Sequence, residues 1–397
     1  MLTWSIIAII FLTAWITADF YFGKKQHQRT TKQTVFPERH STVHFFADGD
    51  DFFKAFLRDI TDAEHHIHVL FYIFREDTLG HRVIEHLAKK VKQGVSVRLL
   101  VDYIGSHGLS KKTIQHIKKL GIEFSYSNKP KLPFLFYTLN QCNHRKITVI
   151  DGKIGYMGGF NVGDEYLGKD AALGDWRDYH LRLTEEGVKD LQVQFAEDWE
   201  RATHQKLTHP SFYPTLSKGS TSLQIIPTNG MNGDHVFLKL IQQAKQSILI
   251  GSPYFIPGKA IQEALIEKVK SGVAVKLLLP MKSDHILVQE AAFPYFQPLL
   301  YAGVEIYRFY QGFYHSKVCM IDNEICDIGT ANFDQRSFHI NFEVNCIIRD
   351  KRVINTVSKA VEWDIYRSEK LTLDAYENRP LLHRSKEQVA LLMSKLL

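Results

Sequence analysis

Alternating helical and strand-like patterns of apolar residues occur twice along this chain. In the first half the apolar spacing predicts helices over residues 52–64, 80–94 and 111–120, and strands over 65–74, 95–102 and 122–126. In the second half it predicts helices over 235–246, 258–272 and a stretch reaching 301, and strands over 247–255, 273–280 and 304–307. Strands that alternate with helices predict an α/β fold with a largely parallel sheet in each half.

The two halves are also similar residue by residue. Residues 91–101 align with 269–279, and residues 120–124 align with 302–306. Proline, serine and glycine cluster between 208 and 220, as is typical of a connection between domains. We therefore expect two domains related by duplication, over residues 41–215 and 216–397.

The N-terminus carries a different pattern, a continuous apolar run. Residues 1–18 contain no charged side chain, and a helix continued to residue 22 is about 30 Å long, enough for one bilayer core. Residues 1–22 are therefore predicted to be a transmembrane anchor, and the basic residues 23–40 a juxtamembrane linker. The positive charge after the run predicts a single-pass protein of the cell membrane with its catalytic body in the cytoplasm. A cleaved signal peptide is the alternative, although a basic segment before the run and a clear cleavage site are both lacking.

The composition is consistent with globular domains behind a membrane anchor and excludes few other classes of protein. The 397 residues are 45% hydrophobic and 23% charged, which is normal for globular domains. A net charge of +6 favours anionic surfaces without indicating nucleic acid. Four cysteines, none in a Cys-x-x-Cys pair, indicate reduced thiols.

One short motif of chemically active residues is present in both halves. It reads His-x-Lys-x-x-x-x-Asp and comprises His144, Lys146 and Asp151 in the first half, and His315, Lys317 and Asp322 in the second. On a strand, residues two apart face the same side, so each His and Lys are expected to project together. Such a pair suits a phosphate, because the ammonium offsets phosphoryl charge while the imidazole attacks phosphorus or moves a proton.

Four further residues are predicted to support this chemistry. Asn161 and Asn332 each follow the motif histidine by 17 positions and can donate amide hydrogens to phosphate oxygens. A nucleophilic imidazole must be neutral, so a carboxylate is expected on its other ring nitrogen, and Asp178 and Glu343 are the candidates. Asp151 and Asp322 are included in the catalytic set, although an Asp at a strand end more often fixes a turn.

His65, His66 and His68 form a competing cluster. Their spacing permits metal binding, but the strand context and the lack of nearby cysteine or acidic partners favour a structural role.

These motifs resemble the signature of the phospholipase D superfamily. Flanking segments are similar to its bacterial cardiolipin synthase branch, namely residues 144–167, 176–178, 253–257, 312–317, 329–337 and 341–343. The resemblance implies two pseudo-twofold-related domains, each a mixed β-sheet flanked by helices, that share one site. The chain departs from the pattern of this branch in one respect. Members of the branch often have two N-terminal membrane helices, and this chain shows one.

The resemblance further implies a two-step phosphatidyl transfer that needs no metal and no cofactor. One histidine, His144 by family precedent, attacks a phosphatidylglycerol and forms a phosphohistidine, while His315 acts as acid and then base. The products are cardiolipin and glycerol. The expected partners are phosphatidylglycerol and anionic membrane lipid, with no nucleic acid, and the sequence leaves the oligomeric state open. Hydrolysis by the same site, as a lipase or a nuclease, is the main alternative, and an inactive lipid-binding scaffold is a remote one.

Overall fold

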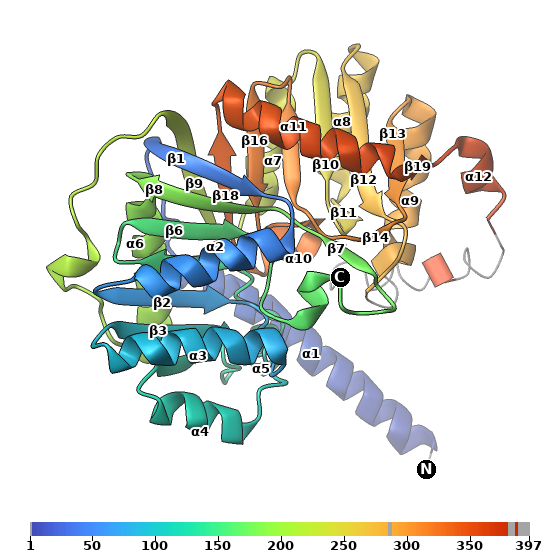
Figure 1. Cartoon of the computed structure of the whole chain (residues 1–397). Helices are drawn as coiled ribbons and strands as arrows, with labels where there is room; N and C mark the ends of the chain where they lie inside the picture. The colour runs from blue at the N-terminus through green and yellow to red at the C-terminus, as the bar shows by residue number, and fades with distance from the viewer. Residues whose placement is uncertain (1, 285–287, 380–385, 388–397) are drawn as a thin grey trace.

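A single large β-sheet runs through the molecule (Figure 1). The computed structural model describes residues 2–284, 288–379 and 386–387. In this described part the sheet contains 15 strands in the order β19-β13-β12-β10-β15-β16-β18-β9-β1-β8-β6-β5-β2-β3-β4. The order from β4 to β1 is repeated from β13 to β9, strand for strand, which is the pseudo-twofold arrangement that the resemblance implied.

The first half follows the predicted order of elements. Its strands are β1 (Arg39–Phe46), β2 (His66–Phe71), β3 (Ser96–Asp102), β4 (Glu123–Ser127), β5 (Ile147–Ile150), β6 (Ile154–Gly158), β7 (Asp175–Arg177) and β8 (His180–Glu185). Its helices are α2 (Gly49–Asp62), α3 (Thr78–Lys92), α4 (Lys111–Lys119), α5 (Leu135–Asn140) and α6 (Gly187–Thr203).

The second half repeats it. Its strands are β9 (Thr221–Asn229), β10 (Ser247–Gly251), β11 (Phe255–Ile256), β12 (Ala274–Pro280), β13 (Glu305–Phe309), β14 (Gly312–Tyr314), β15 (Val318–Ile321), β16 (Ile325–Gly329), β17 (Phe333–Asp334), β18 (Phe342–Ile348) and β19 (Ser368–Lys370). Its helices are α7 (Gly233–Gln243), α8 (Lys259–Lys270), α9 (Val288–Ala302), α10 (Gln335–His339), α11 (Lys351–Tyr366) and α12 (Leu373–Glu377).

The expectation of largely parallel sheets is correct for only part of each half. Strands β2, β3 and β4 pair in parallel, as do β10, β12 and β13, but β5, β6, β8 and β1 pair antiparallel. The reason is the length of the connections. Helices link the parallel strands, whereas the three residues between β5 and β6 leave room only for a hairpin. The sheet is therefore mixed.

The two halves join along elements that the periodicity did not predict. Strands β1 and β9 pair antiparallel over three residue pairs, from Arg39–Leu223 to Ser41–Thr221, and make the sheet continuous. Helix α6 packs against β9 and helix α11 packs against β1, so each covers a strand of the other half. One hydrophobic core cluster consequently includes side chains of both halves, among them Leu181 and Val344.

The N-terminal helix α1 (Leu2–Thr30) is longer than the predicted anchor. It is long and apolar enough to cross a membrane, and it projects from the body (Figure 1). The predicted linker over residues 23–40 is not irregular throughout, because α1 continues to Thr30 and β1 begins at Arg39. The helix is extended by polar residues that still pack on the body, as described below.

Candidate active site

Both motif histidines line one cavity of about 980 Å³ between the two halves. His144 and His315 lie three residues before the first residues of β5 and β15 rather than within these strands. The other residues that line the cavity are Tyr72, Ile73, Arg75, Asn161, Glu165, Tyr166, Asp170, Ala172, Leu173, Trp176, Tyr254, Ser283, Asp284, Val288, Asn332, Asp334, Arg336 and Asn341. The duplicated motif thus contributes to a single site.

A backbone hydrogen bond joins each motif histidine to a residue of the opposite half. The N–H of His144 donates to the carbonyl of Phe342 (2.9 Å), and the N–H of His315 donates to the carbonyl of Arg177 (2.7 Å). Strand β14, just before His315, pairs in parallel with β7, and Asn143 forms the corresponding bridge with Phe342. These contacts place each histidine beside the carboxylate residue that follows its backbone partner.

The predicted carboxylates do contact the histidines, each from the opposite half. His144 Nδ1 lies 2.9 Å from Glu343 Oε2, and His315 Nδ1 lies 2.5 Å from Asp178 Oδ2. Thr330 Oγ1 also donates to Glu343 Oε2 (2.5 Å). A carboxylate that accepts from Nδ1–H selects the tautomer whose Nε2 carries the lone pair. For His144 this leaves Nε2 available, whereas Nε2 of His315 lies 3.1 Å from Lys317 Nζ.

Burial sets the charge of these groups. It lowers the pKa of His144 to about 4 and that of His315 to about 3, although Glu343 and Asp178 oppose the shift. Burial alone would raise the pKa of both carboxyls, but the neighbouring lysine and histidine outweigh it and lower the pKa of each. At neutral pH the site therefore contains two neutral imidazoles, each beside an ionised carboxylate.

The two lysines differ in their contacts. Lys146 Nζ donates to the carbonyl of His144 (2.9 Å) and lies 5.3 Å from the centroid of the Tyr72 ring. Lys317 Nζ likewise donates to the carbonyl of its own histidine, His315, but it also lies against the His315 ring, 2.7 Å from Nδ1 and 3.1 Å from Nε2, and 3.9 Å from Asp178 Oδ2. Burial and the charge of Lys317 lower the pKa of Lys146 to about 7. Burial lowers the pKa of Lys317 to about 8, against the opposing effect of Asp178 and Glu343.

The predicted asparagines lie at equivalent places in the cavity wall. Asn161 Oδ1 accepts from the N–H of Ile73 (3.0 Å), which directs its amide nitrogen away from that strand end as a potential donor. Asn332 is held through its own N–H, which donates to Ser337 Oγ (3.1 Å). The Asn161 side chain is thus fixed by a backbone contact, whereas the bond to Ser337 fixes the backbone of Asn332.

Asp151 and Asp322, which were predicted as part of the catalytic set, are not among the residues that line the cavity, and each follows its strand, β5 or β15. Asp151 accepts hydrogen bonds from the N–H groups of Glu64, His65 and His66, at 2.7–2.9 Å. Asp322 accepts from the equivalent three N–H groups of residues 245–247, each at 2.7 Å. Each carboxylate closes the turn after its strand onto the start of a neighbouring strand, so its role is structural.

These contacts predict that substituting Asp151 lowers the stability of the protein rather than its catalytic activity. Asp151→Ala is expected to cost about 2 kcal/mol of unfolding free energy, because three backbone donors lose a charged acceptor. Asp151→Asn is the control, because it tolerates the left-handed backbone (φ 54°) and keeps one acceptor oxygen. Thermal unfolding in detergent measures the difference. A full loss of turnover by a protein with an unchanged melting temperature would contradict this assignment.

Several residues of the site were not predicted from the sequence. The rings of Tyr72 and Trp176 pack at 4.7 and 4.8 Å against His144 and His315, respectively. Arg75, Arg336 and Asp334 also line the cavity. Trp176 lies two residues before Asp178, and that proximity was the available signal. Asp334 and Arg336 lie on β17 and α10, elements too short for a periodic pattern to predict.

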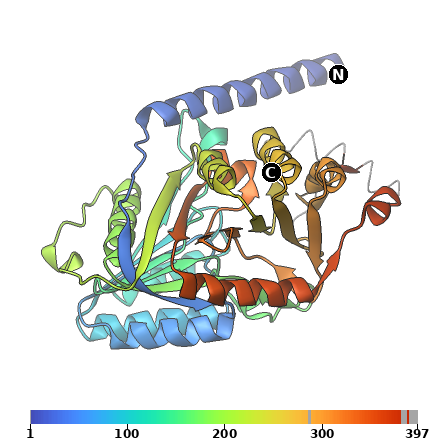
Figure 2. The same ribbon diagram turned by 90° about the horizontal axis from the view of Figure 1, so that it is seen from above.

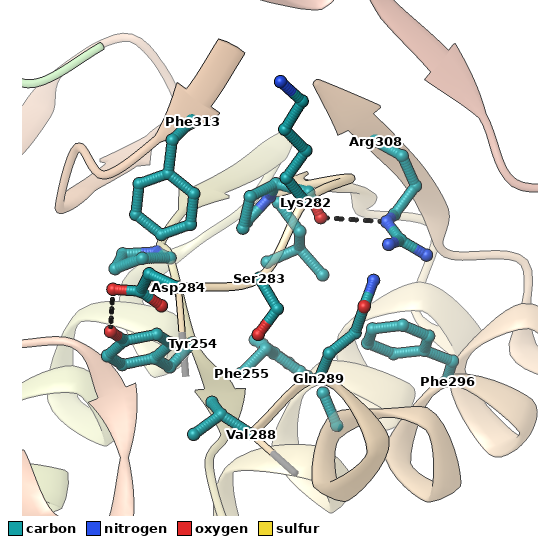
Figure 3. A pocket seen from close by; sticks show the side chains of 14 residues that line it. Tyr254, Phe255, Lys282, Ser283, Asp284, Val288, Gln289, Phe296, Arg308 and Phe313 are labelled. Atoms are coloured by element: carbon teal, nitrogen blue, oxygen red, sulfur yellow. Dashed lines mark hydrogen bonds between the residues drawn. The ribbon is translucent and has the colours of Figure 1, made fainter. Parts of the chain in front are cut away.

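A small pocket of about 20 Å³ adjoins the cavity and shares Tyr254, Ser283, Asp284 and Val288 with it. Figure 3 shows the Tyr254 hydroxyl donating to Asp284 Oδ2 (2.6 Å) and Arg308 Nε donating to the carbonyl of Pro280 (3.0 Å). This space holds no more than a water molecule. The residues around this small pocket form the wall of the cavity on the side of the second half.

Two of the three histidines of the competing cluster lie in the core, and His65 is exposed. His66 and His68 are fully buried, and His68 stacks on Phe195 and bonds Gln192 Oε1 through Nδ1 (3.0 Å). Among the residues that the structure describes, no group of three or more His, Cys, Asp or Glu side chains is arranged to hold a metal ion. The packing of His66 and His68 is that of structural side chains.

The duplicated half-sheets and the paired His–Lys sites define a phospholipase D-like protein. Residues 56–199 and 237–365 match the family model described as "Cardiolipin synthase, PLD-like domain". The chain belongs to this cardiolipin synthase family.

Relatives with similar sequences cover most of this chain. It is 43% identical over 382 residues to the minor cardiolipin synthase ClsB of Bacillus subtilis, covering 96% of both chains. It is 41% identical over 373 residues to cardiolipin synthase 1 of Staphylococcus aureus (strain COL), covering 92% of this chain and 76% of that protein. The crystal structure of phosphatidylserine synthase from Haemophilus influenzae has a TM-score of 0.68 at 14% identity, covering 94% of this chain and all of that one. That likeness is one of fold.

Proposed function

We propose that this chain is a cardiolipin synthase, which transfers a phosphatidyl group from one phosphatidylglycerol to another and releases glycerol. The observation that carries the proposal is the pair of neutral histidines in one cavity, each held by a carboxylate of the opposite half. Such a pair provides a nucleophile and a proton-transfer group, which are the two functions a double-displacement reaction requires. The family and its relatives support a phospholipid as the substrate.

In the first step, Nε2 of His144 attacks the phosphorus of the donor lipid. The bond from phosphorus to the glycerol headgroup oxygen breaks, and His315 gives a proton to that oxygen, so that glycerol leaves and a phosphohistidine remains. In the second step, His315 takes the proton from a headgroup hydroxyl of the second lipid. That oxygen attacks phosphorus, cardiolipin forms, and His144 is released neutral.

The lysine contacts support this assignment of roles. Lys317 Nζ lies against the His315 ring, 2.7 Å from Nδ1 and 3.1 Å from Nε2, where a cation competes with attack on phosphorus but suits an exchange of protons. Both lysines donate to the carbonyl of their own histidine, but in the part of the chain that the structure describes Lys146 Nζ forms no hydrogen bond with the His144 ring. The lone pair of His144 Nε2 is thereby left to act as the nucleophile.

Charge in the site suits an anionic phosphodiester. Lys146 and Lys317 offset the negative charge that develops on phosphoryl oxygens, and Asn161 and Asn332 add amide donors. A bound phosphodiester places negative charge beside His315 and so raises its pKa toward the value that a general acid needs at neutral pH. The bonds broken and formed are alike, so the exchange needs no nucleotide.

The anchor and its basic flank support a cell-membrane location with the body on the cytoplasmic side. Lys24, Lys25, Arg29 and Lys32 follow the apolar run of α1, and basic residues are retained on the cytoplasmic side. The catalytic body then lies next to the anionic lipid of the inner leaflet.

A product analysis tests the proposed reaction. Purified full-length protein in detergent is given phosphatidylglycerol, and lipids and free glycerol are followed together. We expect cardiolipin and glycerol in equal amounts. Phosphatidic acid without cardiolipin would mean that water replaces the second lipid, and would replace the transferase by a hydrolase.

The lysine pKa values predict an unusual alkaline limit. As the pH rises through about 7 and then about 8, Lys146 and Lys317 lose their protons, and kcat/KM should fall in that range instead of near 10.5. On the acid side, His144 stays neutral down to a pH of about 4. Measuring kcat/KM from pH 5 to 10 checks this expectation, and Lys146→Arg should move the fall to higher pH. A flat profile between pH 7 and 9 would contradict it.

A further inference from the structure

Helix α1 is docked on the body along one row of residues. Trp15, Asp19, Gly23 and His27 are spaced four apart and so lie on one face of the helix. Asp19 Oδ1 accepts from the N–H of Tyr137 (2.7 Å), and the Trp15 ring meets the ring of the neighbouring Phe136 edge-on at 5.2 Å. These contacts hold α5 at the level of the apolar part of α1.

Gly23 shows how close this contact is. A Cβ atom at Gly23 would lie 2.7 Å from Cβ of Tyr137, so a larger residue cannot occupy the position without moving α5. The buried Asp19 carboxylate is equally specific, because it takes a backbone donor that α5 leaves unpaired at its first turn. Helix α5 and α1 therefore form one unit, and Figure 1 shows them side by side.

Several large apolar side chains of this unit are exposed. On the α5 segment, Leu132, Leu135 and Leu139 are 80%, 36% and 41% exposed. On α1, Tyr21 and Phe22, which lie outside the docked row, are 59% and 53% exposed. Contiguous exposed apolar side chains mark an interaction surface. We call residues 15–23 and 129–140 together the α1–α5 rim.

We propose that the α1–α5 rim is a membrane-contact surface, in which residues 129–140 enter the bilayer interface beside α1. The reason is the depth in the membrane at which α1 holds residues 129–140. The contacts above fix α5 against residues 15–23, and these residues continue the apolar run that is long enough to cross a bilayer. Lys129 and Lys131 are exposed at the start of the segment, where they can meet anionic headgroups.

Two contacts connect helices α5 and α1 to the cavity. Arg336, which lines the cavity, donates to the carbonyl of Asn140 at the end of α5 (3.0 Å). His27 stacks on the ring of Phe342 (5.8 Å), whose carbonyl accepts from the N–H of His144. If the reaction is the proposed one, a rim immersed in lipid holds the cavity where its substrates are.

Depth-dependent quenching tests the surface without using activity, so its failure is distinct from failure of the proposed reaction. The four native cysteines are buried, so Leu132→Cys and Leu135→Cys can be labelled selectively in the full-length protein. Tyr366→Cys is the control, because Tyr366 is 78% exposed at the end of α11, and Figure 2 shows α11 on the side opposite α1. In phosphatidylglycerol-containing vesicles, brominated acyl chains should quench the two leucine-site labels and spare the control. Quenching of those labels by aqueous iodide, as for Tyr366→Cys, would overturn the proposal.

A functional prediction follows from the same contact. Leu132→Glu and Leu135→Glu should lower turnover of phosphatidylglycerol in vesicles by about tenfold or more, because a carboxylate is costly in the bilayer. Turnover of monomeric short-chain phosphatidylglycerol should be unchanged, and Tyr366→Glu should change neither. Unchanged turnover in vesicles would contradict the proposal, and so would an equal loss on both substrates, which would place the leucines in folding or chemistry.

Discussion

Replacing either motif histidine with alanine is expected to abolish cardiolipin formation, with kcat/KM falling roughly 10³-fold or more. The physical reason is that the cavity contains one copy of each function: without His144 no covalent intermediate forms, and without His315 no group protonates the leaving glycerol. Two independent sites would instead leave about half of the activity in each variant. His86→Ala, on the exposed side of α3, is the matched control.

The two variants should then differ in one respect. A donor with a good leaving group, such as a p-nitrophenyl phosphodiester, needs no general acid. His315→Ala should therefore regain release of p-nitrophenol in a single turnover, whereas His144→Ala should not. The reverse pattern would exchange the two roles. Near-full activity of either variant on phosphatidylglycerol would contradict the shared site itself.

Glu343→Gln and Asp178→Asn are expected to lower kcat by roughly 10²- to 10⁴-fold while leaving the fold intact. Each change keeps the shape of the side chain but removes the charge that fixes the Nδ1–H tautomer and stabilises the imidazolium. Because these carboxylates raise the pKa of their histidines, their loss also lowers the pKa of each imidazole further. The proton-transfer histidine is then harder to protonate, and Asp178→Asn should shift the active range to lower pH.

A buried carboxylate elsewhere in the second half provides the control. Asp327 is equally enclosed, bonds Asn345, and has its pKa raised to about 7 by burial. Asp327→Asn should retain nearly full activity, because no histidine depends on this charge. Equal losses in Asp327→Asn and Glu343→Gln, measured as kcat on the same lipid, would show that the effect is one of general packing.

Local patterns sufficed for the alternating helices and strands of each half. Helices α2, α3, α4, α7 and α8 and the strands β2, β3, β4, β12 and β13 lie within a few residues of their predicted bounds, because each shows its buried face through the period of its own apolar residues. The elements at the seam, β1, β9, α6 and α11, were missed. Their neighbours come from the other half or from both, so the period in one segment does not reveal what covers it.

The sequence by itself determined the chemistry: two histidines, two lysines, two asparagines and two carboxylates, duplicated in matching order. The tertiary structure decided how they combine. His144 meets a carboxylate 199 positions away and His315 one 137 positions away, each in the opposite half. The tertiary structure also places Asp151 and Asp322 away from the cavity and α5 against the anchor helix. The physical reason is that periodicity records which face of an element is buried, whereas the partner on that face is fixed only when the halves pack together.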